Sequence, residues 1–205
     1  MYPLHGGVLT ERFAALVCVA LNAACTSLDG EATRRHIRAA LSSGATGEQI
    51  VFAVKCATAV ALHALSVAAP LLAEETGAPA TSSVGATPAC DAIRAAGQWN
   101  TAWDAFGGLD PLWTEQFMTM GIGIYTAGVF TSREVELLSI AIDASVSHLY
   151  VPGIRRHIRG ALDAGASVGE IMAVLQLCVS QGVQSCNLAL PILDDELSRI
   201  SAEQQ

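Results

Sequence analysis

The pattern of apolar and polar positions predicts helices along most of the chain. After Thr10, apolar side chains recur every three or four positions, and Thr10 itself is a suitable N-cap. A second helix carries the sequence RRHIRAAL and is expected to end at Gly44, where glycine tolerates the left-handed conformation of a C-cap. Thr46 then caps a third, longer helix that ends or kinks at about Pro70. β-Branched alternation is weak and alanine is abundant, so the predicted fold class is all-α.

The same pattern returns once, at a constant offset of 121 residues. Residues 34–45 read RRHIRAALSSGA, and residues 155–166 read RRHIRGALDAGA. Between residues 9–72 and 130–193, 19 of 64 positions are identical without a gap. We therefore interpret the chain as a tandem duplication. The expected units are a first repeat over residues 1–73, a flexible linker over 74–90, bridging helices over 91–129 and a second repeat over 130–205.

The segment between the two repeats has a composition of its own. Residues 74–89 are rich in glycine, proline, serine, threonine and alanine, which predicts a flexible loop. Aromatic residues near helical spacing follow, with Gly107 and Gly108 expected to end one helix. Asp110 and Pro111 are expected to begin the next, because aspartate caps a helix and proline is tolerated in the first turn. We interpret the aromatic residues as packing rather than as a cofactor site.

One apolar stretch raises the question of a membrane. The mean hydropathy of the chain is +0.43, and residues 50–73 are long and apolar enough to suggest a transmembrane helix. The equivalent stretch of the second repeat carries several polar side chains, and two copies of one repeat should share a fold. We therefore expect a core or subunit-interface helix and no membrane contact.

Charge and cysteine content narrow the possible functions. Lysine and arginine number 11 against 19 aspartate and glutamate, which gives a net charge of −8 and disfavours nucleic acid as a partner. None of the six cysteines is spaced as CxxC, so a cysteine zinc site or a thioredoxin-type pair is not expected. Unpaired cysteines in apolar segments and the lack of a signal-peptide pattern predict a cytoplasmic protein.

The repeat resembles the carboxymuconolactone decarboxylase and AhpD-like superfamily. The matching pattern is a Glu-Leu pair in an apolar helix, then HxRxAL, then Gly-Ala-Thr/Ser, then Glu-Ile and a helix of small residues. In the second repeat these are residues 136–137, 157–162, 165–167 and 170–171, and the first repeat matches at 36–41 and 44–46. The resemblance implies an AhpD-like helical bundle that oligomerises. Because single-copy members commonly form hexameric rings, a tandem chain is expected to form a homotrimer.

The resemblance also implies a chemistry. AhpD-like members reduce peroxides through a CxxC, which this chain lacks, so a peroxidase of that kind is not expected. The decarboxylase branch implies a lyase that acts on a small oxygenated carboxylate by general acid/base catalysis, without a cofactor or a metal. Two alternatives stay open: another cofactor-free enzyme on the same fold, such as an isomerase or hydrolase, and a non-catalytic binding or assembly protein.

Six residues are candidates for the site. His157 is the expected acid or base, because its neighbours on the helix are small or apolar and point it towards the core or a pocket. Glu136, in an apolar helix, either orients a histidine or lies beside an arginine at the surface. The candidate catalytic residues are His157, Glu136 and His148, and the candidate substrate-binding residues are Arg155, His63 and Gln184. For each, a structural role in packing, in an ion pair or at a helix end is the alternative.

Overall fold

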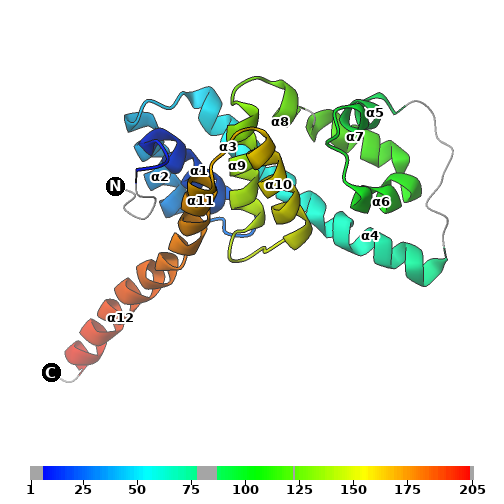
Figure 1. The fold of residues 1–205 in the computed structure, drawn as a ribbon. Helices are drawn as coiled ribbons and strands as arrows, with labels where there is room; N and C mark the ends of the chain where they lie inside the picture. Colours follow the sequence, from blue (N-terminus) through cyan, green and yellow to red (C-terminus); the bar gives the residue numbers. More distant parts are fainter. Residues whose placement is uncertain (1–6, 78–86, 122, 204–205) are drawn as a thin grey trace.

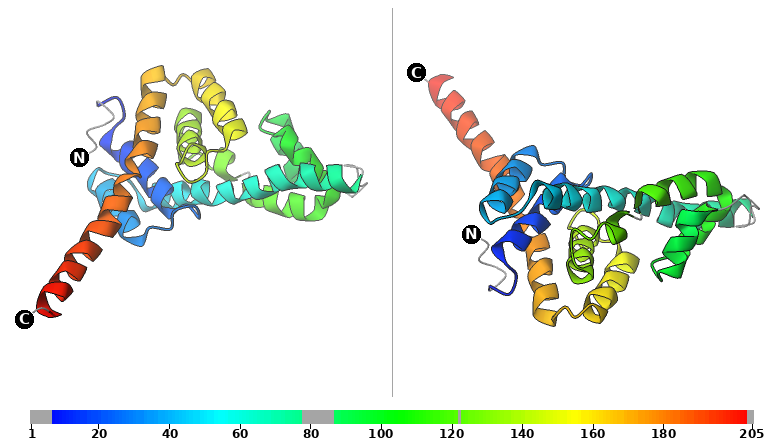
Figure 2. Two further views of the ribbon diagram at one scale, coloured as in Figure 1. Left: turned by 90° about the horizontal axis from the view of Figure 1, so that it is seen from below. Right: turned by 90° about the horizontal axis from the view of Figure 1, so that it is seen from above.

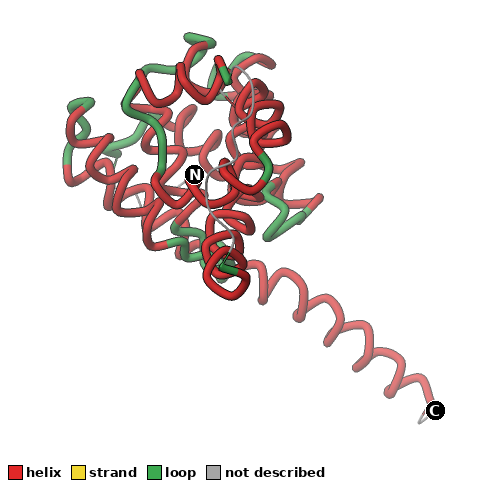
Figure 3. The backbone as a smooth tube through the Cα atoms, turned by 90° about the vertical axis from the view of Figure 1, so that its right-hand side faces the viewer, coloured by secondary structure: helices red, strands yellow, loops and turns green. Residues whose placement is uncertain are grey.

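The structure is a computed structural model that describes residues 7–77, 87–121 and 123–203. These residues form helices joined by short loops, with no strand among them (Figure 3). The first repeat holds α1 (Glu11–Ala23), α2 (Gly30–Ser42), α3 (Gly47–Ala59), a 3₁₀ turn (Val60–Leu62) and α4 (His63–Thr76). The bridging segment holds α5 (Pro88–Ala95), a 3₁₀ turn (Thr101–Trp103), α6 (Asp104–Leu109), α7 (Pro111–Gly121) and α8 (Gly123–Thr126). The second repeat holds α9 (Ser132–Asp143), α10 (Val151–Asp163), α11 (Val168–Ser180) and α12 (Val183–Glu203).

Side-chain caps fix the beginnings of the principal helices. The hydroxyl of Thr10 accepts a hydrogen bond from the backbone N–H of Phe13 at the start of α1. Thr46, Thr131 and Ser167 each form a complete capping box with the third residue of the helix they begin. The loops after α2 and α10 pass through Gly44 and Gly165, both with positive φ. The predicted starts of α1, α3, α9 and α11 are therefore confirmed.

The main core lies where α1 and α9 meet, near the centre of the molecule (Figure 1). Almost every residue of α1 from Phe13 to Asn22 is buried, because small side chains let α2, α3, α9 and α11 approach it on all sides. Helix α9 has the same role in the second repeat, where it packs on α10 and α11. The bundle is thus built around two central helices that occupy equivalent places in the two repeats.

A second, smaller core forms away from this bundle, at the far end of α4. Helix α4 runs out of the bundle and packs against α6 and the 3₁₀ turn that precedes it (Figure 1). The apolar side chains of this second core are Leu62, Ala69, Ala89, Cys90, Ile93, Trp103, Phe106 and Met118. The indole N–H of Trp103 donates to the hydroxyl of Ser66 at 3.1 Å, which fastens the bridging segment to α4.

Helix α12, unlike α4, is not packed against the bridging segment. It projects from the bundle into solvent, and none of its residues is buried in the single chain (Figure 2). Its large apolar side chains stay exposed: Val183, Leu188, Leu190, Ile192, Leu193, Leu197 and Ile200.

The third helix of each repeat differs from its prediction. The first-repeat helix ends at Ala59 and passes through a 3₁₀ turn into α4, which carries Pro70 in its interior. The equivalent Pro191 lies inside α12. Proline removes a single backbone N–H from the helix, and in α4 packing against the bridging segment outweighs this loss. The break falls before the proline, at residues that keep right-handed helical φ and ψ, so the 3₁₀ turn tightens the helix and does not redirect the chain.

The bridging segment also departs from its prediction. Gly107 and Gly108 do not end a helix but lie inside α6. A Cβ at position 107 would lie 3.7 Å from the ring of Trp99, so this glycine faces a packed aromatic side chain rather than a turn. The chain reverses instead at Gly97, where φ is +68°. Most of the predicted flexible linker, residues 78–86, lies outside the described residues.

Residues Gly47–Thr76 meet the length and composition of a membrane-spanning helix, with a mean hydropathy of 1.9 over their most apolar window. In the structure this stretch is interrupted by the 3₁₀ turn, and 44% of the window is buried inside the protein. Its inward side chains, including Phe52 and Leu62, belong to the two cores. Both cores therefore account for much of its apolar character.

Candidate functional site

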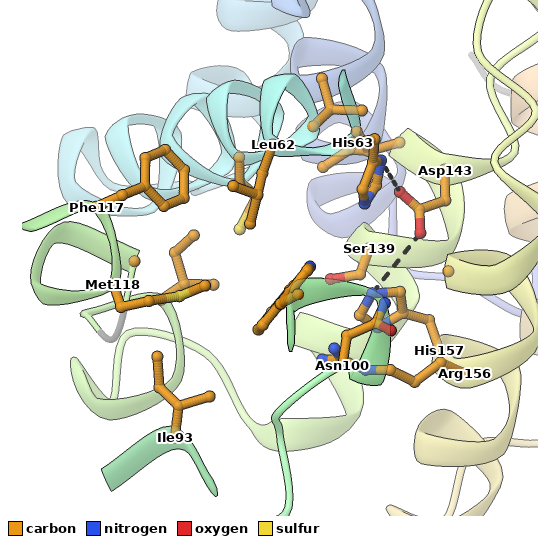
Figure 4. A pocket seen from close by; sticks show the side chains of 18 residues that line it. Leu62, His63, Ile93, Asn100, Phe117, Met118, Ser139, Asp143, Arg156 and His157 are labelled. Atoms are coloured by element: carbon orange, nitrogen blue, oxygen red, sulfur yellow. Dashed lines mark ion pairs between the residues drawn. The ribbon is translucent and has the colours of Figure 1, made fainter. Parts of the chain in front are cut away.

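A cavity of about 90 Å³ lies where the two repeats and the bridging segment meet (Figure 4). Its apolar wall comes mainly from the 3₁₀ turn before α4 and from the bridging segment, with Leu62, Ile93, Trp103, Phe117 and Met118. Its polar wall comes mainly from α9 and α10. The polar side chains lining it are His63, Asn100, Ser139, Asp143, Arg156 and His157.

His157 and Glu136 form a buried pair on one side of this cavity. Nδ1 of His157 lies 2.6 Å from Oε2 of Glu136, and each residue is less than a tenth exposed. The carboxylate accepts the Nδ1–H, so it fixes the ring and leaves Nε2 directed towards Asp143 and the cavity (Figure 4). Burial lowers the pKa of His157, and the bond to Glu136 opposes that shift. Glu136 therefore orients a histidine, whereas Arg133 pairs with Glu170 at 3.2 Å.

Asp143 lies between two histidines at the end of α9 (Figure 4). Its Oδ1 is 3.6 Å from Nδ1 of His63, and its Oδ2 is 3.7 Å from Nε2 of His157. Both distances exceed a hydrogen bond, and Oδ2 has no hydrogen-bond partner among the described residues. Burial raises the pKa of Asp143 to about 7, against the opposing charge of Arg156. The site therefore holds a buried carboxyl group that its surroundings do not satisfy.

Two glycines of α10 make room for these carboxyl groups. A Cβ at Gly160 would lie 2.7 Å from the carboxyl carbon of Glu136, and one at Gly153 would overlap Oδ2 of Asp143. Neither glycine has a positive φ, so close approach rather than backbone freedom explains them. The small face of α10 that the sequence showed beside His157 therefore accommodates α9.

His63 separates the cavity from a more open groove of about 690 Å³ on the other side of α4. Its Nδ1 lies 2.7 Å from Nε2 of His148, and its ring stacks on Tyr150 at a centroid distance of 3.8 Å. Burial lowers the pKa of His63 to about 3, with a further contribution from the two neighbouring histidines. Burial also lowers the pKa of His148. His148 thus lies in the loop after α9, where it contacts His63.

The remaining two candidates lie elsewhere. Arg155 is exposed on the outer face of α10 and does not line the cavity. The neighbouring Arg156 lines it instead, and its guanidinium donates to the backbone and side-chain oxygens of Gln98 at 3.1 and 3.0 Å. Gln184 donates to Oδ1 of Asn22 at 2.8 Å, in the first repeat and away from the cavity. Successive helix residues point roughly 100° apart, so Arg156 lies on the same side of α10 as His157, whereas Arg155, one residue further, faces outward.

The first repeat carries a neutral version of the same arrangement. At the offset of 121, Ala15 stands for Glu136 and Asn22 for Asp143. The two glycines of α10 correspond to Ala32 and Ala39 of α2. The buried acids Glu136 and Asp143 of the second repeat therefore have neutral counterparts in the first.

Sequence reasoning missed four polar residues of the cavity: Asn100, Ser139, Asp143 and Arg156. Asp143 left a detectable signal, because an acidic residue inside an apolar helix is costly unless it has a partner. Asn100 left no such signal, since it belongs to the bridging segment and reaches the site only through the packing of α4.

Comparisons with known proteins agree with this architecture. A family model described as the carboxymuconolactone decarboxylase family matches residues 111–195. A crystal structure from Burkholderia xenovorans LB400, of a protein provisionally described as a gamma-carboxymuconolactone decarboxylase subunit, superimposes with a TM-score of 0.84. Sequence identity to it is 30%, and the match covers 97% of this chain and 85% of that one. No curated protein matches the sequence.

Proposed function

This chain belongs to the carboxymuconolactone decarboxylase family, and from that premise we propose that it is a lyase that decarboxylates a small oxygenated carboxylate. The observation that carries the proposal is the buried His157–Glu136 pair, held at 2.6 Å beside a small cavity with an apolar wall. A lone buried histidine is ordinary, but one oriented by a carboxylate next to a cavity has the arrangement of an acid/base catalyst.

The chemistry follows from where each group lies. When the bond to the carboxylate breaks, CO₂ leaves and the electron pair stays on the remaining carbon, which then takes a proton. His157 is suited to deliver this proton from Nε2, because Glu136 occupies Nδ1. The apolar wall replaces water around the departing carboxylate, which favours its loss. Arg156 provides a cation on the cavity wall for a second anionic or carbonyl oxygen of the substrate.

The test is the turnover of gamma-carboxymuconolactone by the purified protein, followed by CO₂ release and by product analysis. His157→Ala should lower turnover by roughly 10²-fold or more while the helical circular dichroism stays unchanged. His36→Ala is the matched control, because His36 occupies the equivalent place in the first repeat, where Ala15 stands in the position of Glu136. That variant should keep full activity.

Three results would reject the proposal. Full activity of His157→Ala would remove the acid/base role. Ring opening or isomerisation without release of CO₂ would show a hydrolase or an isomerase on this fold. Binding of lactone carboxylates without any turnover would favour a binding protein.

A further inference from the structure

We propose that His63, Asp143 and His148 form a binding site for a divalent transition-metal ion of the zinc type. One donor atom from each residue lies within 4.8 Å of the other two. Imidazole nitrogen and carboxylate oxygen are ligands that zinc and iron(II) accept in proteins, whereas magnesium and calcium prefer oxygen alone. The three residues come from α4, the end of α9 and the loop that follows α9, so no sequence motif marks them.

The distances are close to those of a bound ion. Bonds of about 2.0–2.2 Å in a tetrahedral site place neighbouring ligand atoms roughly 3.3 Å apart. Nδ1 of His63 and Oδ1 of Asp143 are 3.6 Å apart, near that separation. Nδ1 of His63 and Nε2 of His148 are 2.7 Å apart, which is a hydrogen bond that would open by roughly 0.6 Å. His148 is the ligand able to move, since it is half-buried in a loop at the edge of the groove.

The neighbourhood of the three residues is already ordered. The backbone N–H of Tyr150 donates to the carbonyl of Asp143 at 2.9 Å, and the N–H of His148 donates to the carbonyl of Ser145 at 2.9 Å. The ring of Tyr150 stacks on that of His63. These contacts hold the end of α9, the loop after it and the start of α4 together before any ion binds. Less conformational entropy is therefore lost when the ion binds.

The buried charge of Asp143 is one that a cation bound at Oδ1, beside His63, would offset. The unsatisfied oxygen of the same carboxylate is Oδ2, which faces Nε2 of His157 at 3.7 Å. Asp143 is 3% exposed, and its Oδ2 has no hydrogen-bond partner among the described residues. The guanidinium of Arg156 influences Asp143 electrostatically but gives two of its donors to Gln98. A buried carboxylate with so little compensation is costly in an empty apolar setting, and a coordinated cation removes that cost.

The first repeat gives an internal comparison on the same scaffold. The counterparts of His63, Asp143 and His148 are Gln184, Asn22 and Ser27, so all three ligands change together. There, Gln184 and Asn22 satisfy each other directly at 2.8 Å. At the equivalent position, which has no acid or imidazole, the two amides of Gln184 and Asn22 form a hydrogen bond. At the position with the acid and the imidazoles, Oδ2 of Asp143 has no hydrogen-bond partner among the described residues.

Three protein ligands leave a fourth coordination position, as in catalytic rather than structural zinc sites. His63 lines both the cavity and the groove, so an ion bound there would lie at the boundary between them. The fourth position could then take water or an oxygen atom of a small ligand. This site goes beyond the proposed decarboxylation and does not depend on it.

The experiment is a zinc titration of the full chain after removal of metal with a chelator. Isothermal calorimetry should show one Zn²⁺ per chain. His63→Gln, Asp143→Asn and His148→Ser each introduce the residue found at the equivalent position of the other repeat, and each should weaken binding by at least about tenfold. Cys25→Ser is the matched control in the same groove and should leave the affinity unchanged.

A spectroscopic variant separates loss of a ligand from loss of the fold. His148→Cys should retain binding, and its Co²⁺ complex should gain a thiolate-to-metal absorption that the unaltered protein lacks. Absence of Zn²⁺ binding to the unaltered protein would overturn the proposal. Equal Zn²⁺ affinity in Asp143→Asn and His63→Gln, or a Co²⁺ spectrum that does not change in His148→Cys, would do the same.

Discussion

At the residue scale, the pKa of His157 depends on the burial of its ring and on the charge of Glu136. Desolvation lowers the pKa of His157, while the carboxylate of Glu136 at 2.6 Å raises it. The two effects oppose each other, and burial is the larger, so the net shift of the His157 pKa is downward. A neutral residue with the shape of Glu136 should therefore leave desolvation as the main effect on the pKa of His157.

Glu136→Gln provides that change. We expect the pKa of His157 to fall further below its ordinary value, because the neutral amide no longer favours the imidazolium. A pH titration of the histidine ring resonances by NMR, on metal-free protein, measures it directly. His36 titrates in the same sample and should be unaffected, since Ala15 stands opposite it in the first repeat. An unchanged or higher pKa for His157 would contradict this account.

The cysteines are expected to take no part in the chemistry. Burial raises the pKa of Cys18, Cys56 and Cys178 to about 12, and the thiolate is the reactive form. In the native protein, iodoacetamide should therefore label the exposed Cys25 and Cys186 and spare these three, as read by mass spectrometry. Replacing Cys178 and Cys186 by alanine should leave any activity largely intact. Peroxide reduction that disappears with either thiol would contradict this.

At the element scale, the two repeats pack the same helices with different residues. Helices α9 and α10 approach closely because glycine stands wherever a carboxyl group of α9 needs space. Helices α1 and α2 have Ala15 with Ala39 in place of Glu136 with Gly160, and Asn22 with Ala32 in place of Asp143 with Gly153. The packing of α9 on α10 is therefore coupled to the acidic residues of the site, and a change in one should require a change in the other.

Gly160→Ala tests this coupling. The new Cβ would lie 2.7 Å from the carboxyl carbon of Glu136, so we expect the free energy of unfolding to fall by about 1–3 kcal/mol. Combining it with Glu136→Ala recreates the Ala15–Ala39 pair of the first repeat and should remove most of this penalty. Urea unfolding of the four proteins of the cycle measures the coupling.

Gly169→Ala in α11 is the control, because its new Cβ would make only ordinary contacts from 3.6 Å. Additive effects of the two substitutions at positions 136 and 160 would show that no such coupling exists.

The sequence predicted helix starts better than helix ends. Capping residues such as Thr46 act within one turn, so local sequence is enough to find them. The end of α3 and the turn at Gly97 depend on how α4 meets the bridging segment, which is tertiary packing. In the same way, the pair His157 and Glu136 was predictable from one repeat, whereas Asp143 and His63 meet only because α4 crosses to the other repeat.

At the scale of the whole molecule, the two repeats end differently. Helix α4 leaves the bundle and is covered by the bridging segment, which follows it in the chain. Helix α12, its counterpart at the offset of 121, has no buried residue and projects from the bundle (Figure 2). Each chain thus has one such helix packed against the bridging segment, α4, and one without a buried residue, α12. An exposed apolar helix of this kind on a protein usually marks an interface.

We therefore expect chains to associate through α12 into a closed homotrimer. A closed ring covers every copy of α12, whereas an open chain leaves one exposed at its end, and three tandem chains supply the six repeats of the ring that the family resemblance implies.

Light scattering at micromolar concentration should give three times the chain mass of 21.3 kDa. Leu193→Glu with Leu197→Glu, both on exposed positions of α12, should reduce the mass to that of one chain, because charge is costly in an apolar interface. Ser42→Glu on the exposed face of α2 is the control and should leave the trimer intact. A monomeric mass for the unaltered protein would contradict the prediction and would show that α12 is stable in water with its apolar side chains uncovered.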